Sequence, residues 1–161
     1  MPKPVWLEEA EKHIGQKEYP GKANNPWIVQ LWKKIKRGGI KEDSVPWCAA
    51  FVGGCLESAG IVSSRFESAK SYLKWGVPLS HPLLGCIVVF ARTGGGHVGF
   101  VAGVDKEFRL MVLGGNQSDS VSIAPFERVR VVGYRWPKNF PETDATLPIF
   151  SSAAPASSNE A

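Results

Sequence analysis

The sequence predicts an α+β fold in which N-terminal helices pack on a small antiparallel β-sheet. Up to about residue 75, apolar residues recur with a helical period between capping residues. After Pro82, short apolar runs alternate with glycine-rich turns, which is typical of strands. Helices that come first and strands that come later favour α+β over repeating βαβ units. A 161-residue chain that is 43% hydrophobic can build one core of this kind.

The helices are predicted from their ends as well as from their apolar faces. Pro4 and Gly15 bracket the first helix, and Asn25 followed by Pro26 is a cap and first position for the second. Pro46 fixes the start of the third helix, while Gly76 stops a short fourth one. The expected ranges are 5–14, 25–37, 45–58 and 68–75.

The strands are predicted from apolar runs that glycine-rich segments separate. Cys86 to Ala91 is a continuous apolar run, as in a strand buried on both faces. The further strands are expected at 97–104, 109–113, 121–124 and 129–136. We therefore expect one domain over residues 1–137. Residues 138–161 are rich in Pro, Ser, Ala and Thr, and are predicted to be a flexible tail.

The formal net charge of +4 favours an anionic partner, such as a cell-wall polymer or an outer-membrane surface, although solubility alone also explains it. The basic residues form no single stripe, so we expect no nucleic-acid partner. No apolar run approaches the roughly 20 residues that span a membrane, and the charged N-terminus does not resemble a signal peptide. We expect a monomer made in the cytoplasm without a Sec signal and without membrane insertion.

Cysteine and histidine spacing argues against a disulfide or a metal site, and we expect no cofactor. Cys48 and Cys55 lie in one predicted helix with Cα atoms about 10 Å apart, too far to bridge. The chain has no CxxC pair, and its three histidines are not at ligand spacing. A metal hydrolase is therefore a weak alternative.

Cys48 is the candidate nucleophile because of its place in the first turn after Pro46. Backbone N–H groups there lack helical partners, so they are expected to lower the pKa of the thiol and to bind an oxyanion. The alternative is a buried structural thiol, which is our interpretation of Cys55 and Cys86.

His97 is the candidate base, since it follows three glycines and begins an apolar strand. Gly99 shares its face and is expected to leave space for substrate. The alternative is an inert histidine at a strand edge. Asn116, after Gly114 and Gly115, is the candidate that orients the imidazole, with Gln117 and Asp119 as replacements. A plain turn explains this segment equally well.

These residues occur in an order that resembles a known group. The segments are Gly15–Glu18 with Asn25-Pro26, Val45–Val52, Gly96–Phe100, Leu113–Asp119 and Gly133–Pro137. The chain resembles NlpC-type and CHAP cysteine peptidases of the papain-like superfold, and more closely a family of phage and prophage cell-wall hydrolases.

The resemblance implies an endopeptidase or amidase that cuts amide bonds of peptidoglycan stem peptides, with Cys48, His97 and Asn116 as catalytic residues. Trp47, Glu18, Trp75 and Gln117 are then candidates for substrate binding, although Glu18 is better explained as a brace and the tryptophans equally well as core. The biological setting stays open between a phage endolysin and a secreted antibacterial toxin, and the scissile bond between peptidase and amidase sites. The same triad can also run acyl transfer. A non-catalytic wall-binding or phage structural module is the alternative of another class.

Overall fold

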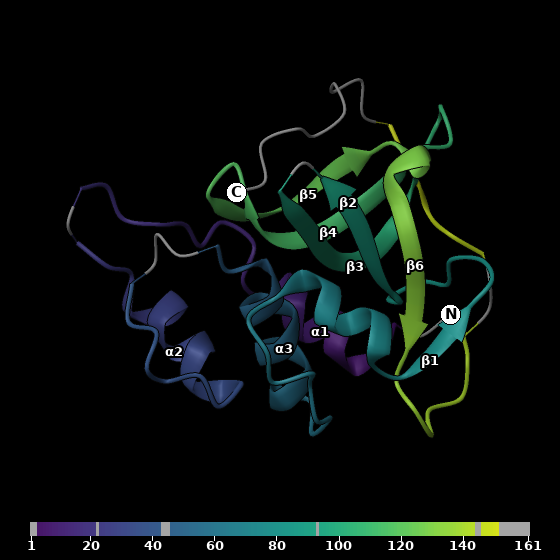
Figure 1. Ribbon diagram of the computed structural model, residues 1–161. Coiled ribbons are helices and arrows are strands. Elements are labelled where there is room, and N and C mark those ends of the chain that lie inside the picture. The colour runs from purple at the N-terminus through teal and green to yellow at the C-terminus, as the bar shows by residue number, and fades with distance from the viewer. Residues whose placement is uncertain (1–2, 22, 43–45, 93, 144–145, 152–161) are drawn as a thin grey trace.

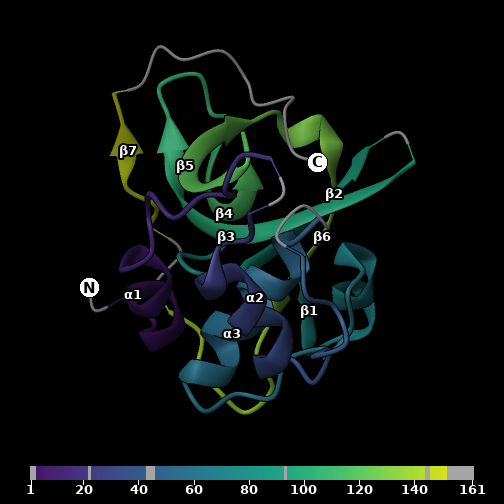
Figure 2. The same cartoon turned by 90° about the vertical axis from the view of Figure 1, so that its left-hand side faces the viewer.

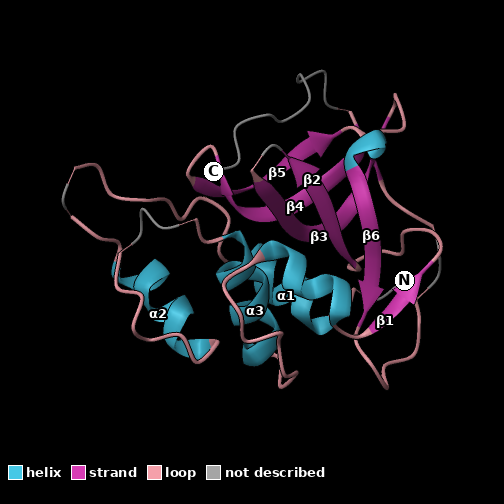
Figure 3. Ribbon diagram, in the orientation of Figure 1, coloured by secondary structure: helices cyan, strands magenta, loops and turns pink. Residues whose placement is uncertain are grey.

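A computed structural model describes residues 3–21, 23–42, 46–92, 94–143 and 146–151. It has two layers, with helices gathered on one side of an antiparallel sheet (Figures 1 and 3). The helices are α1 (Val5–Glu11), α2 (Pro26–Lys34) and α3 (Cys48–Ser58), with the 3₁₀ helices η1 (Ala69–Lys74) and η2 (Arg128–Arg130). The strands are β1 (Val77–Leu79), β2 (Ile87–Arg92), β3 (Gly95–Asp105), β4 (Leu110–Gln117), β5 (Ser120–Phe126), β6 (Val131–Trp136) and β7 (Ile149–Phe150). The predicted α+β layout is therefore confirmed.

The strands pair in the order β1-β6-β2-β3-β4-β5, and β7 adds to β3. β2, β3 and β4 form the centre of this sheet, and their pairings are antiparallel. β2 and β3 are largely buried, and every residue of β4 is buried. The view in Figure 2 shows the helices against one side of this sheet. The centre of the sheet is thus covered, and strand ends there can position buried polar groups.

α3 is the central helix and is buried along most of its length. Two glycines bring α2 close to it: an added Cβ at Gly53 would lie 2.5 Å from Ile35 Cγ2, and one at Gly54 would lie 2.7 Å from Leu31 Cδ2. Larger side chains at either position would push the helices apart. The close packing fixes α3, and with it the residue at its first position.

The helix boundaries agree with the predictions to within a few residues, with local differences. Asn25 caps α2 as predicted, because its side chain accepts a hydrogen bond of 2.9 Å from Trp27 N. α1 ends at Glu11, and the short fourth helix is of the 3₁₀ type. The predicted start of the third helix at Val45 lies outside the described residues, and α3 begins at Cys48 itself. No described helix is long and apolar enough to cross a membrane.

Two short strands were not predicted. β1 pairs with β6 through Val77 and Trp136, and β7 runs parallel to the end of β3, with Ile149 opposite Val104. β7 lies within the segment predicted to be a flexible tail, whose last residues, 152–161, are outside the described part of the chain. A two-residue strand carries little periodicity, so the sequence pattern could not indicate it.

Candidate active site

Cys48 is the first residue of α3, and Trp47 is its N-cap. Its thiol is nearly buried, with 4% of the residue exposed. The sulfur receives backbone hydrogen bonds from Val98 in β3 and from Ala49 at the start of α3. Val98 follows His97 directly, so the structure brings the start of α3 against the segment of β3 that carries the candidate base.

Burial raises the pKa of the Cys48 thiol above its ordinary value. Hydrogen bonds from the backbone N–H groups of Val98, Ala49 and Cys48, together with the charge of Arg92, act in the opposite direction but do not outweigh burial. This corrects the expectation of a lowered pKa, because a position in the first turn was considered without the packing that covers it. The direction of this shift favours the thiol over the thiolate in the free protein.

We expect the alkylation rate of Cys48 by iodoacetamide to rise about tenfold per pH unit from pH 7 to beyond pH 9. Only the thiolate reacts, and below a raised pKa its fraction grows with pH. Cys86 lies in the core, where burial raises its pKa to about 12, so it should stay unlabelled in the folded protein. Mass spectrometry of timed samples gives the rate at each site. A rate that levels off below pH 7 would contradict a protonated resting thiol.

His97 is fully buried on β3, with its ring held in a stack of aromatic side chains. The Phe126 ring lies parallel to it at a centroid distance of 5.3 Å and an interplanar angle of 7°, and Phe90 stacks at 6.3 Å. These contacts fix the plane of the imidazole. On its edge, Nε2 lies 3.0 Å from Gln117 Oε1.

The orientation of the Gln117 amide determines the tautomer of His97. Gln117 Nε2 donates to the carbonyl oxygens of Val112 at 3.2 Å and Ser122 at 2.9 Å. A carbonyl only accepts, so this amide atom is the nitrogen and the other is the oxygen. His97 Nε2 must then carry the hydrogen that it donates to Gln117 Oε1. A neutral His97 is left with its lone pair on Nδ1, as a general base requires.

Gly114 is the residue beneath this hydrogen bond. An added Cβ would overlap Gln117 Oε1 and would lie 3.3 Å from His97 Nε2. The site thus requires a residue without a side chain at this point of β4. The run Gly114-Gly115-Asn116, which the sequence offered as a turn, is part of the strand that supports the imidazole.

Asn116 is buried and has a left-handed backbone, with φ of 61°. The register between β4 and β5 shifts between Gly114 and Gln117. This bulge breaks the alternation that would put Asn116 on the face of Leu110 and Val112. The acceptor of the hydrogen bond from His97 Nε2 is the next residue, Gln117, which the sequence offered as a replacement and as a substrate-binding candidate.

The space beside Gly99 is not open to substrate, contrary to the prediction. An added Cβ there would lie 2.5 Å from Val112 Cγ1 and 3.1 Å from Leu113 O. Gly99 allows β4 to approach β3, so its role is packing within the sheet.

The other predicted substrate-binding residues fall into different environments. Trp47 is fully buried and donates from Nε1 to Glu18 Oε2 at 2.9 Å, which favours packing for the indole and bracing for the carboxylate. Trp75 is partly exposed and donates from Nε1 to Val62 O at 3.0 Å. It lines a cleft of about 630 Å³, whose other lining residues are Ser63, Ser64, Phe66, Ser68, Lys70, Ser71 and Lys74.

No sequence pattern indicates this cleft, since serines and lysines between two helices are typical of any surface loop. Over the described parts of the chain, no three metal-ligating side chains come together. The candidate site holds a buried thiol at a helix start, with backbone N–H groups of Val98 and Ala49 directed at the sulfur, and a buried imidazole on the residue before Val98.

A thiol at a helix N-terminus, held against the strand residue that follows a buried histidine, is the arrangement expected of a cysteine hydrolase. Residues 40–116 match the CHAP domain family, which supports the CHAP/NlpC-type peptidase superfamily for this segment. CHAP domains are generally hydrolases that act on peptidoglycan. No curated protein matches the chain. The matched segment contains Cys48, His97 and the cleft residues, and it ends one residue before Gln117.

Proposed function

We propose that the protein hydrolyses an amide bond in peptidoglycan stem peptides, with Cys48 as nucleophile and His97 as general base. The observation that carries the proposal is that the helix-N-terminal thiol of Cys48 accepts from the backbone of Val98, directly after His97, whose donating nitrogen is fixed by Gln117. The match of residues 40–116 to the CHAP domain supplies the substrate class. A wall-binding or phage structural module without catalysis would not need this tautomer control.

In the proposed reaction, Nδ1 of His97 takes the proton of the Cys48 thiol as sulfur attacks the amide carbonyl carbon. The N–H groups of Cys48 and Ala49, at the start of α3, stabilise the oxyanion. The carbon–nitrogen bond breaks, and His97 gives its proton to the leaving amine. Water then hydrolyses the thioester, which frees the new carboxylate and restores the thiol.

We assign the orientation of His97 to Gln117, on the strength of their hydrogen bond and of the fixed amide. Asn116, the sequence-based candidate for this role, is a buried neighbour that we place in the shell supporting the site. Glu18 is assigned a bracing role through Trp47. No cofactor enters the reaction.

We further propose that the enzyme acts as a phage or prophage endolysin that reaches the periplasm or wall after holin release. A toxin delivered into a rival by a secretion system is the second candidate, and it would depend equally on Cys48. A holin gene beside this one would favour the first setting and an immunity gene the second.

Digestion of purified peptidoglycan, followed by mass spectrometry of the fragments, tests the reaction. We expect new free amines on stem peptides if the enzyme is an endopeptidase. A freed lactyl group on the sugar would identify an amidase within the same mechanism. New reducing sugars, or an unchanged wall, would overturn the proposal.

A further inference from the structure

The cleft next to the candidate active site is lined by residues from the loop after α3 and from η1. Lys70 joins this cleft to the catalytic strand, since an added Cβ on Gly96 would lie 3.2 Å from Lys70 Cγ. Gly96 precedes His97 directly. A chain that occupies the cleft is therefore adjacent to the strand that carries the base.

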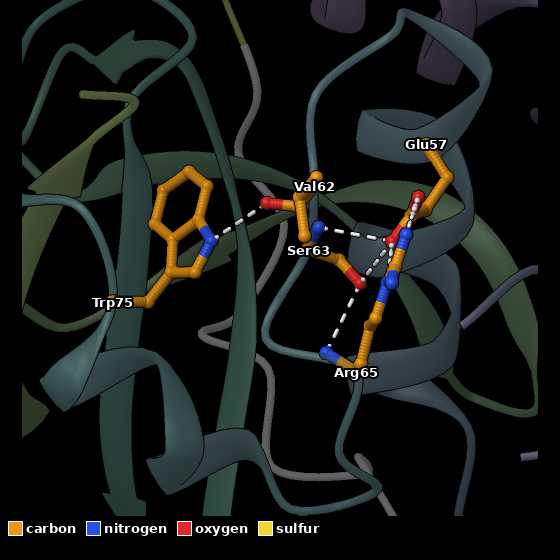
Figure 4. A network of polar contacts seen from close by, with 5 residues as sticks. All are labelled: Glu57, Val62, Ser63, Arg65 and Trp75. Atoms are coloured by element: carbon orange, nitrogen blue, oxygen red, sulfur yellow. Dashed lines mark hydrogen bonds and ion pairs between the residues drawn. The ribbon is translucent and has the colours of Figure 1, made fainter. Parts of the chain in front are cut away.

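The carboxylate of Glu57, in α3, binds the loop that forms one side of the cleft. Glu57 Oε2 accepts hydrogen bonds from Ser63 N at 3.0 Å and Ser63 Oγ at 2.9 Å, and it pairs with Arg65 Nε at 3.0 Å. Figure 4 shows this network beside Trp75, whose indole is tied to Val62 O. These hydrogen bonds hold the side of the cleft in one conformation without a ligand. Less conformational entropy is therefore lost when a ligand binds.

The serine hydroxyls of the cleft are engaged largely with one another. Ser71 Oγ donates to Ser68 O at 2.6 Å, so the hydrogen in its 2.7 Å contact with Ser64 Oγ comes from Ser64. Ser68 Oγ accepts from Lys70 N at 3.2 Å. Charge recognition in the cleft must therefore come from other side chains.

Lys70 and Lys74 are those side chains, since both are exposed and line the cleft. The nearby carboxylates are neutralised: Glu57 pairs with Arg65, and Glu67 pairs with Arg37 at 3.2 Å. Among the described residues, neither lysine forms an ion pair. The cleft thus presents two positive charges that act on whatever enters it.

Two aromatic side chains give the cleft an apolar surface beside the lysines. Trp75 and Phe66 stand at the cleft, and Phe66 is 44% exposed although its ring carries the guanidinium of Arg37 at 4.9 Å. Aromatic faces pack against the short aliphatic portions of a peptide. Two cations with two aromatic rings suit an extended peptide that bears free carboxylates.

We propose that this cleft binds the stem peptide beside the scissile amide, with Lys70 and Lys74 recognising a free carboxylate of the substrate. The inference rests on the proposed function for the choice of peptide. A stem peptide fits because its γ-linked glutamate leaves the α-carboxylate free. The lysines bind this group through charge-assisted hydrogen bonds, and the aromatic rings cover the adjoining methyl and methylene groups.

The test measures binding in a Cys48→Ala background, so that cleavage does not interfere. Isothermal titration calorimetry compares the synthetic peptide L-Ala-γ-D-Glu-L-Lys with the same peptide carrying an α-carboxamide. We expect the carboxylate form to bind about tenfold more tightly, and the double change Lys70→Gln, Lys74→Gln to remove that difference. The matched control is Lys106→Gln with Lys138→Gln, which changes the net charge equally at exposed positions outside the cleft.

The outcomes separate the two proposals. Equal affinity for both peptides in the unaltered cleft, no binding of either, or the same loss in the control variant would overturn the cleft assignment, even if the enzyme digests the wall. Lysine-dependent binding without any wall digestion would retain the cleft as a site for anionic peptides and would overturn the hydrolase instead.

Discussion

Replacing Cys48 by alanine is expected to abolish the digestion of purified peptidoglycan and to leave the fold intact. The thiol supplies the only bond to substrate in the proposed reaction, and removing such a nucleophile costs about 10⁴-fold or more in rate. The side chain lost is small, and the buried neighbours of Cys48 are retained, so we expect a stability change of about 1 kcal/mol. Turbidity of a wall suspension gives the rate, and circular dichroism with thermal unfolding checks the fold.

Cys55→Ala is the matched control for this variant. Cys55 lies in the same helix and is 2% exposed, but it is a full two turns away from the helix start. Its removal should cost similar stability and leave digestion unchanged. Full activity in Cys48→Ala would refute the mechanism, and loss of activity in both variants with intact folds would assign the effect to helix packing.

The positions of the elements were predictable because local patterns encode them. Asn25 and Pro26 mark the start of α2 through local capping, and the apolar run from Cys86 to Ala91 indicates the strand that the structure has as β2, from Ile87 to Arg92. The same patterns place Cys48 at the first position of α3 and His97 near the start of β3, although β3 begins at Gly95 and not at His97 as predicted.

The support of His97 was not predictable from the same patterns. A bulge between Gly114 and Gln117 decides which side chain reaches the imidazole, and a strict alternation along the strand selects Asn116 instead. Bulges arise from how two strands pair, which a single strand's composition does not specify. The raised pKa of Cys48 was unpredictable for a similar reason. Burial by segments distant in the sequence outweighs the effect of the helix start.

The Glu57 network could not be predicted from the sequence either. Glu57 lies at the end of α3, where a charged residue is usually solvated, yet it organises the loop that carries Ser63 and Arg65. Its pKa is lowered, because hydrogen bonds from Arg65 and Ser63 outweigh the burial that would raise it. The cleft exists only because this loop is ordered, so no residue of its lining stands out in the sequence.

Gly114→Ala is expected to reduce wall digestion about 100-fold without unfolding the protein. The added methyl group would overlap Gln117 Oε1 and crowd His97 Nε2, so the two side chains cannot keep their hydrogen bond of 3.0 Å. Gly114 has no left-handed backbone, so an alanine adds steric conflict at the site and no backbone strain. Gly39→Ala is the control, because open space surrounds its position.

A double-mutant cycle with Gln117→Met shows whether Gly114 acts through Gln117. Methionine has a similar volume but no oxygen to accept from His97, so we expect this variant to lose about 10- to 100-fold in rate by itself. If both changes disturb one hydrogen bond, the double variant should be no slower than the slower single variant. Multiplied losses would instead mean that Gly114 and Gln117 serve separate functions. A near-normal rate in Gly114→Ala would show that catalysis does not depend on the imidazole orientation that Gln117 sets.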